Sequence, residues 1–160
     1  MRHNCLLSQK NSPITIVRMF NTTGSRQTGR YGMVLPRFIQ QALHNEPITV
    51  YGNGTQTRCF CDVRDMITIL NLLAESKTSI GKIVNVGHKR EISINDLAKL
   101  VKEHAKSFSE IQYIPYKVAY QEEFSDIQRR RPDLSLLHEL IQFKPNYTLE
   151  QTIDSLINSQ

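Results

Sequence analysis

Short β-branched runs alternate with amphipathic segments along this chain of 160 residues, and no other feature restricts its fold more. Runs of Ile, Val and Thr favour strands, whereas apolar residues spaced three and four apart favour helices. The patterns predict strands at 14–17, 48–51, 58–61, 83–86 and 111–114, and helices at 33–44, 63–74, 94–105, 134–141 and 149–157. Residues 1–11 have the pattern of a helix end whose beginning is absent. Such alternation indicates an α/β fold, without repeats or low-complexity linkers.

Two of the predicted helices begin with recognisable capping residues. Ser93 and Thr148 each precede a helical pattern, and Asp96 and Gln151 follow them by three residues, as in a capping box. Between the first strand and the first complete helix, residues 21–32 are rich in Asn, Thr, Ser and Gly. That composition predicts a loop.

Length and composition indicate one soluble globular domain. Hydrophobic residues make up 39% of the chain and charged residues 22%, which are ordinary values for a folded protein. No apolar run approaches the ~20 residues of a membrane helix, and the N-terminus lacks the apolar core of a signal peptide. Three cysteines without a CxxC pair or spaced histidines indicate neither a disulfide framework nor a zinc site. We therefore expect a cytoplasmic protein with no membrane partner and no metal.

The net charge of +5 is concentrated in the first 64 residues. That part carries eight basic residues against Glu46 and Asp62, so its net charge is +6. Seven of the eight are arginines, which recognise phosphate or carboxylate with paired hydrogen bonds. The pattern predicts an anion site, although a solvated basic surface is an alternative for any single arginine.

Two motifs of dinucleotide-dependent enzymes are missing or misplaced. The nearest approach to G-x-G-x-x-G is Gly52-Asn53-Gly54, which lacks the third glycine and leads into a strand rather than a helix. Tyr113 and Lys117 have the spacing of a catalytic Tyr-x-x-x-Lys pair, but the intervening Pro115 breaks the helix that would place them on one face. We therefore assign no catalytic residue.

An arginine stands at the start of an otherwise apolar strand within residues 50–63, which read VYGNGTQTRCFCDV. Arg58 beside a diphosphate would form charge-assisted hydrogen bonds, each contributing roughly 1.5–3 kcal/mol. The alternative is a structural salt bridge from Arg58 to Asp62 or Asp65. Tyr51 offers a ring for a nucleobase and a hydroxyl for ribose, or else packs in the core.

Three consecutive arginines at 129–131 form a second basic feature. They could contact nucleic acid, but they lack interleaved aromatic residues and lie near Glu122 and Glu123. We therefore expect no nucleic-acid partner. The nearby Asp133 is expected to cap the helix that follows it.

Several blocks of the sequence stand in a characteristic order. They are Arg18–Arg26 (RMFNTTGSR), Met33–Phe38 (MVLPRF), Tyr51–Arg58 (YGNGTQTR), Val84–Gly87 (VNVG) and Arg129–Asp133 (RRRPD). This order resembles the C-terminal half of the NAD-dependent epimerase/dehydratase family, the extended short-chain dehydrogenases that act on nucleotide sugars. Members of that family read R-x-F-N-x-x-G-P-R-Q, V-x-P-R-F, V-Y-G-D-G-x-Q-x-R-x-F-x-x-V-x-D and R-R-x-P-D. The resemblance runs from about Thr15 to the C-terminus.

The resemblance implies the C-terminal part of an extended short-chain dehydrogenase. Residues 1–32 would be the remnant of the Rossmann-type NAD-binding domain, and 33–160 mainly the small α/β nucleotide-sugar-binding domain. Because the glycine-rich turn and the helical Tyr/Lys pair are absent, we expect a truncated chain that is inactive alone and does not hold NAD by itself. Relatives are mostly homodimers, so the full-length protein is expected to be one. The apolar stretch from Ile14 to Phe20 would be exposed and prone to association.

The resemblance also implies which residues contact ligands. Phe20 and Asn21 would lie near the nicotinamide of NAD. The nucleotide sugar, a UDP-sugar or another NDP-sugar, would contact Asn21, Val34, Leu35, Phe38, Tyr51, Arg58 and Arg130. For Asn21 the alternative is a loop cap, and for Phe20 a core position.

Departures from the family pattern bear on the reaction. In nucleotide-sugar decarboxylases an arginine commonly precedes the Val34 position, and this chain has Met33 there. We therefore expect a UDP-sugar 4-epimerase of the UDP-glucose 4-epimerase type, although Arg30 could replace the missing arginine. A UDP-glucuronate decarboxylase and a 4,6-dehydratase are the alternatives, and a non-catalytic nucleotide-sugar-binding module is one of another class. Ser25 in place of proline and Asn53 in place of aspartate are mild departures.

Overall fold

The structure is a computed structural model that describes residues 13–25, 27, 33–119 and 126–160. The segments predicted at 1–11 and around Arg30 lie outside the described residues, as does Cys5. Its elements are β1 (Ile16–Met19), β2 (Thr22–Thr23), α2 (Val34–Leu43), β3 (Ile48–Tyr51), β4 (Thr57–Cys59), β5 (Cys61–Asp62), α3 (Val63–Glu75), η1 (Lys77–Ser79), β6 (Ile83–Val86), β7 (Glu91–Ser93), α4 (Ile94–His104), β8 (Ile111–Ile114), α5 (Tyr116–Ala119), β9 (Arg129–Arg130), α6 (Ser135–Leu140) and α7 (Leu149–Ile157). The α/β fold and the predicted long helices are confirmed.

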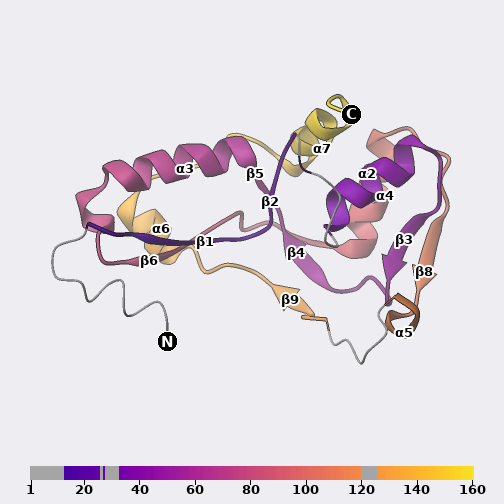
Figure 1. Ribbon diagram of the computed structural model, residues 1–160, viewed down its shortest axis with the longest axis horizontal. Helices are drawn as coiled ribbons and strands as arrows, with labels where there is room; N and C mark the ends of the chain where they lie inside the picture. The colour runs from indigo at the N-terminus through magenta and orange to yellow at the C-terminus, as the bar shows by residue number, and fades with distance from the viewer. Residues whose placement is uncertain (1–12, 26, 28–32, 120–125) are drawn as a thin grey trace.

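The molecule is elongated, and its elements gather at two ends (Figure 1). At one end β1 pairs with β6 in parallel, and α3 and α6 pack on this pair. The core there includes Cys61, Met66, Ile69, Val84 and Leu137. Because β6, α3 and α6 follow residue 32 and share this core with β1, the packing does not divide at that residue. The domain boundary stays a prediction.

At the other end β3 pairs with β8 in parallel, next to the helices α2 and α4, and α7 packs on these two helices. The side chains of Phe38, Ile39, Ile48, Leu97 and Ile153 are fully buried in this second core. Burial of one such side chain contributes about 1.5–3 kcal/mol, so this cluster fixes where α2 begins. The first turn of α2 is therefore held against β3, at the edge of the pocket described below.

Strand β4 connects the two ends. It pairs with β7 in antiparallel fashion and with β9 in parallel fashion. The predicted strand at 58–61 is interrupted at Phe60, after which β5 pairs with β2. Strands β2, β7 and β9 were not expected from the sequence. Each pairs over only two or three residues, so tertiary pairing rather than local periodicity forms them.

Strand β1 has β6 as its one partner among the described strands. Ile16 and Val17 are half-buried, whereas the side chain of Met19 is 56% exposed. The expected exposure of this stretch is thus found mainly at Met19, and the expected association stays a prediction. No helix in the described ranges is long and apolar enough to cross a membrane.

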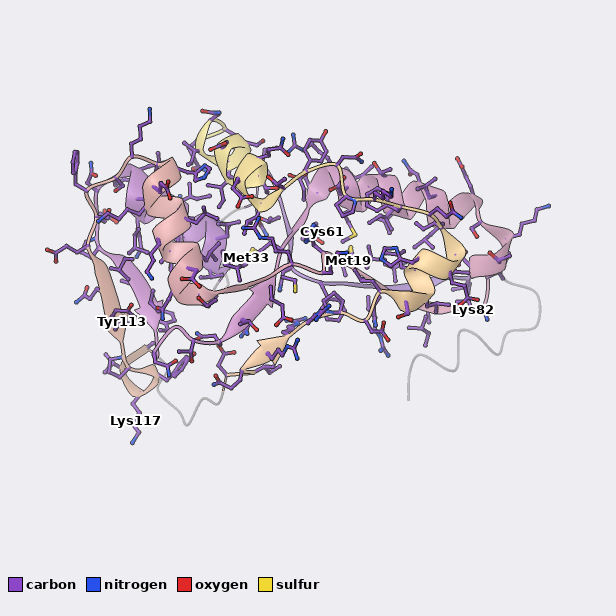
Figure 2. The ribbon with its side chains drawn as sticks, turned by 180° about the vertical axis from the view of Figure 1, so that it is seen from behind. Met19, Met33, Cys61, Lys82, Tyr113 and Lys117 are labelled. Carbon is purple, nitrogen blue, oxygen red and sulfur yellow. The ribbon has the colours of Figure 1, made fainter. Side chains whose placement is uncertain are left out.

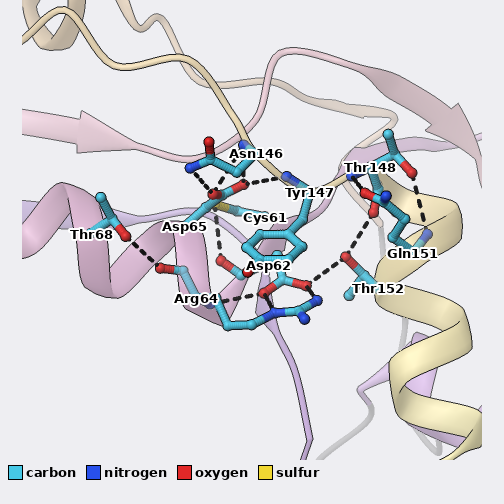
Figure 3. Close-up of polar contacts among 10 residues, drawn as sticks. All are labelled: Cys61, Asp62, Arg64, Asp65, Thr68, Asn146, Tyr147, Thr148, Gln151 and Thr152. Atoms are coloured by element: carbon cyan, nitrogen blue, oxygen red, sulfur yellow. Dashed lines mark hydrogen bonds and ion pairs between the residues drawn. The ribbon is translucent and has the colours of Figure 1, made fainter.

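Two carboxylates at the start of α3, Asp62 and Asp65, form a clasp with α7 and with the segment before it (Figure 3). Asp65 is 1% exposed and accepts hydrogen bonds from the backbone N–H groups of Asn146 and Tyr147 and from the Asn146 side chain. Asp62 caps α3 by accepting from the N–H of Arg64, and it also accepts from the Thr152 hydroxyl at 2.8 Å. This clasp joins the two ends of the molecule.

Asp62 is ionised within the clasp. Burial alone would raise the pKa of this carboxyl, but hydrogen bonds from Arg64 and Thr152 outweigh burial and lower it. The Arg64 guanidinium lies 2.7 Å from Asp62 and 3.6 Å from the centre of the Tyr147 ring. Asp62 and Asp65 are therefore both engaged by other partners, and the alternative of a salt bridge from Arg58 to either of them is wrong.

Candidate functional site

A pocket of about 560 Å³ opens where the end of β1, the first turn of α2 and strands β3, β4 and β9 come together. This volume is within the usual range for sites that enclose small molecules. Six of the residues expected from the sequence line it: Asn21, Val34, Leu35, Tyr51, Arg58 and Arg130. The fold thus brings together positions separated by more than a hundred residues of sequence.

Arg58 and Arg130 are register partners in the parallel pair β4–β9. Side chains at paired positions of neighbouring strands lie on the same face, with the strands about 4.8 Å apart. Both guanidinium groups therefore line the same pocket. The register thus places the two arginines on one face, and their expected contact with a nucleotide sugar stays a prediction.

Arg58 is already engaged on one side. Its Nη2 donates to Asp126 at 2.6 Å, and its Nη1 donates to the carbonyl oxygens of Thr57 and Ile127 at 2.8 and 2.7 Å. The side chain is only 14% exposed. Asp126 is thus the carboxylate partner that the sequence did not identify.

Arg130 is engaged differently. Its guanidinium lies 5.5 Å from the centre of the Phe20 ring, within range of a cation–π contact. It makes no hydrogen bond or ion pair with the described part of the chain, so all five of its N–H donors can reach water or an anion. Phe20 is half-buried beneath it and does not line the pocket.

Tyr51 is half-buried, and one face of its ring is covered. The guanidinium of Arg37 lies 4.0 Å from the ring centre, while its Nη2 donates to the carbonyl oxygen of Thr49 at 3.0 Å. Arg37 also lines the pocket. The sequence identified Tyr51 but not this cation stacked on it, because the arginine comes from α2.

Asn21 is half-buried, and it both holds the loop and lines the pocket. Its backbone has a φ of 38°, which asparagine adopts more readily than most residues. Its side-chain nitrogen donates to the carbonyl oxygen of Cys59 at 2.8 Å, and its own carbonyl oxygen accepts from the N–H of Cys61. The loop-cap alternative is therefore realised, while Asn21 still lines the pocket.

The three positions expected from α2 have different surroundings. Val34 and Leu35 line the pocket, although Leu35 is only 1% exposed. Phe38 is 0% exposed and belongs to the core cluster, one helical turn away from the lining. The structure thus places Phe38 beneath the pocket rather than in it, where it holds the first turn of α2.

The Tyr-x-x-x-Lys spacing is not helical. Tyr113 lies in strand β8 and is 52% exposed, whereas Lys117 lies in the short helix α5 beyond Pro115 (Figure 2). The prediction that this pair cannot act as a helical catalytic pair is confirmed. No group of His, Cys, Asp and Glu within the described ranges could hold a metal ion.

The other two arginines of the run turn away from the pocket. Arg129 lies 2.7 Å and Arg131 3.4 Å from the carboxylate of Glu91. Hydrogen bonds from Arg129 lower the pKa of Glu91 to about 2. Together with Lys89 and His138, these arginines line a second, more open hollow outside the candidate site. Two of the three arginines are therefore held in ion pairs.

Comparisons with known proteins agree with this arrangement. A sequence model of the NAD dependent epimerase/dehydratase family matches residues 5–87. The chain is 39% identical over 146 residues to a UDP-N-acetyl-alpha-D-glucosaminuronate decarboxylase of Bacillus cytotoxicus, covering 91% of this chain and 45% of that protein. It is 36% identical to UDP-glucuronic acid decarboxylase 1 of Danio rerio, covering 94% of this chain and 34% of that one.

Solved structures show the same fold. The UDP-glucuronic acid 4-epimerase of Bacillus cereus, in complex with UDP-glucuronic acid and NAD, superposes with a TM-score of 0.83 at 27% identity, over 99% of this chain and 49% of that one. The epimerase Mth375 of Methanothermobacter thermautotrophicus gives 0.88 at 21% identity, covering 98% and 46% of the two chains, and so supports the fold alone. The chain spans less than half the length of these relatives. Since the family model spans just over half of the 160 residues, the chain belongs to the NAD-dependent epimerase/dehydratase family.

Proposed function

We propose that the pocket binds the diphosphate of a nucleotide sugar, with Arg58 and Arg130 as its two cationic contacts. The single observation that carries this proposal is their register pairing on β4 and β9, which directs two guanidinium groups into one pocket. A diphosphate carries oxygens on two neighbouring phosphorus atoms. A pair of adjacent arginines therefore suits a diphosphate ligand better than it suits a ligand with a single carboxylate.

The hydrogen-bonding state of the arginines supports an anionic ligand. Arg58 has five N–H groups, of which three donate to Asp126, Thr57 and Ile127, so two remain among the residues that the structure describes. Arg130 retains all five within the described structure. Charge-assisted hydrogen bonds to phosphate contribute roughly 1.5–3 kcal/mol each, so losing either arginine should weaken binding about tenfold or more.

For the nucleoside we propose the wall formed by Tyr51 and Arg37. Because the Arg37 guanidinium is stacked on the Tyr51 ring, a nucleobase would contact the stacked pair rather than the tyrosine ring alone. Both planar groups can stack on an aromatic ring. Val34 and Leu35 supply the apolar lining beside them.

For the reaction of the whole protein we propose a nucleotide-sugar conversion that begins with oxidation of the sugar. NAD, when bound, accepts and returns a hydride. Phe20 and Asn21, at the carboxyl end of β1, are the residues of this chain proposed to face its nicotinamide. Gly52 and Gly54 connect two strands and offer no helix N-terminus, so the described residues supply no cradle for the dinucleotide pyrophosphate.

Two reactions fit this family equally well. The Met33 position favours a 4-epimerase, and the B. cereus structure with this fold is a UDP-glucuronic acid 4-epimerase. The relatives with 36–39% identity are instead named as decarboxylases of UDP-linked uronic acids. We therefore propose a UDP-sugar 4-epimerase or a UDP-uronate decarboxylase. Incubating the whole protein with NAD and UDP-glucuronate distinguishes them, since only decarboxylation releases CO₂.

A non-catalytic nucleotide-sugar-binding module is the second candidate. The observation that favours it is the strand and helix geometry of Tyr113 and Lys117, which leaves the described chain without a helical Tyr/Lys pair. In that case the chain would bind UDP-sugars, and adding NAD would give no sugar product. Formation of product by the purified 160-residue chain would exclude this candidate.

Isothermal titration calorimetry with UDP, TDP and GDP tests the proposed site directly. Arg58→Met and Arg130→Met should each weaken UDP binding about tenfold or more, because each removes charge-assisted hydrogen bonds. Arg90→Met is the matched control, since Arg90 is an exposed arginine paired with Glu150. Equal affinity in all three variants, or no binding of any nucleoside diphosphate by the wild type, would refute the site.

A further inference from the structure

Arg58 is held by a chain of hydrogen bonds that begins at the far wall of the pocket. The Tyr116 hydroxyl donates to Asp126 Oδ2 at 3.1 Å, while Asp126 Oδ1 accepts from Arg58 at 2.6 Å. Gln56 Nε2 in turn donates to the Tyr116 hydroxyl at 2.9 Å. We propose that Asp126 and Tyr116 are positioning residues that hold Arg58 ready for a diphosphate, an inference that rests on the proposed function.

The chain of hydrogen bonds is anchored in the fold at both ends. Gln56 is 5% exposed, and its side-chain nitrogen also reaches the carbonyl oxygen of Tyr51 at 3.3 Å. At the other end the Arg58 guanidinium is fixed by the carbonyl oxygens of Thr57 and Ile127. The network therefore links the proposed nucleoside wall to the proposed phosphate contact.

The Tyr116 ring packs against the backbone of the loop that contains Gly52 and Gly54. Gly52 has a φ of +72°, and a Cβ added there would lie 2.3 Å from the Tyr116 ring. Only a residue without a side chain lets the ring lie this close to the backbone. The first glycine of the loop is thus explained by contact with a positioning residue, not by contact with a phosphate.

The geometry favours positioning over competition between Asp126 and the ligand. Asp126 accepts from only one of the five N–H groups of Arg58, and the two carbonyl oxygens take two more. Within the described structure two N–H groups of Arg58 remain, and an arginine can bind a phosphate through two donors. With Arg58 fixed before the ligand arrives, less side-chain freedom is lost on binding.

Calorimetry with UDP on variants of Asp126 tests whether this carboxylate raises or lowers the affinity for UDP. If Asp126 positions Arg58, affinity should decrease in the order wild type, Asp126→Asn, Asp126→Ala, because the amide oxygen of asparagine still accepts from the guanidinium. We expect a loss of about tenfold for the alanine variant, the loss of one hydrogen bond to a charged group. A carboxylate that merely competes with the phosphate would give the opposite order and overturn the inference.

Variants of Tyr116 test the second proposed positioning residue. Tyr116→Phe keeps the ring on Gly52 and removes only the hydroxyl, so UDP affinity should fall about threefold. Tyr113→Phe and Asp154→Asn are the matched controls, since both residues are exposed and lie outside the network. The controls should leave UDP affinity unchanged. An unchanged affinity in Tyr116→Phe would remove Tyr116 from the network.

A second set of variants separates positioning from general destabilisation. In an Arg58→Met background, Asp126→Ala should change UDP affinity less than about twofold, because the group that it positions is gone. A full tenfold loss in that background would show that Asp126 acts through the fold and would overturn the inference. If the wild type binds no nucleoside diphosphate, the proposed function fails as well. If the wild type binds but the order of the Asp126 variants is reversed, only this inference fails.

Discussion

Removing the carboxylate of Asp65 should destabilise the protein more than removing any exposed carboxylate. Asp65 is 1% exposed at the start of α3, and both of its oxygens face the segment before α7 (Figure 3). It accepts from the N–H of Asn146 at 3.1 and 3.2 Å and from the N–H of Tyr147 at 3.2 Å. Asp65→Ala would leave both backbone donors without a partner inside the clasp.

The magnitude follows from counting these donors. A buried donor left without a partner costs about 1–3 kcal/mol, and the Asn146 side chain, which also donates to Asp65, can turn to water. Two backbone donors therefore give a loss of about 3 kcal/mol in the free energy of unfolding. For a chain of this length, 1 kcal/mol shifts Tm by about 2–4 °C, so Tm should fall by roughly 6–12 °C. Asp65→Asn keeps one acceptor oxygen, so its Tm should lie between the Tm of the wild type and that of Asp65→Ala.

Thermal unfolding followed by circular dichroism at neutral pH measures the effect. Asp154→Ala is the control, since Asp154 is 53% exposed and its hydrogen bond with His104 lies on the surface. Such a surface pair contributes about 0–1 kcal/mol. The reasoning would be refuted if Asp65→Ala and Asp154→Ala lowered Tm by the same amount, because the clasp would then carry no special stability.

Three further perturbations follow from the structure. Hydrogen bonds from Arg90 lower the pKa of Glu150 to about 2. The stability that this pair contributes is therefore complete above the ordinary glutamate pKa of 4.5 and is lost as pH falls toward 2. Glu150→Gln should reduce the decrease of Tm between pH 4.5 and pH 2. Burial raises the pKa of the Cys61 thiol to about 12, so iodoacetamide at pH 8 should modify Cys61 only after unfolding in guanidinium, as peptide mass spectrometry would show. Gly52→Ala should weaken UDP binding and lower Tm more than Gly81→Ala, since both have positive φ but only the former would place its Cβ 2.3 Å from an aromatic ring carbon.

Local signals identified the helices well. Thr148 and Gln151 form the capping box that their spacing indicated, and the Ser93 side chain accepts from the N–H of Asp96 at the start of α4. Asp133 accepts from the N–H of Ser135, the first residue of α6. These interactions join residues two or three positions apart, so the sequence itself contains both partners.

Partners that are distant in sequence could not be paired in the same way. The alternative considered for Arg58 was a salt bridge to Asp62 or Asp65, which are close in sequence, yet its carboxylate partner is Asp126, 68 residues later. Strand β9 brings Asp126 there, and it is too short to show a periodic pattern. Tyr116 was missed for the same reason, since its role depends on a glycine more than sixty residues earlier.

The three arginines at 129–131 show how register converts a uniform basic run into distinct contacts. Successive side chains of a strand point to opposite faces, so Arg129 and Arg131 share a face and Arg130 takes the other. Glu91 of β7, which pairs with Cys59 of β4, forms ion pairs with both Arg129 and Arg131. A slip of β9 by one residue would break both ion pairs at once and turn Arg130 out of the pocket. Glu91 therefore stabilises the register in which Arg130 stands beside Arg58, and the proposed diphosphate site depends on a carboxylate that does not line it.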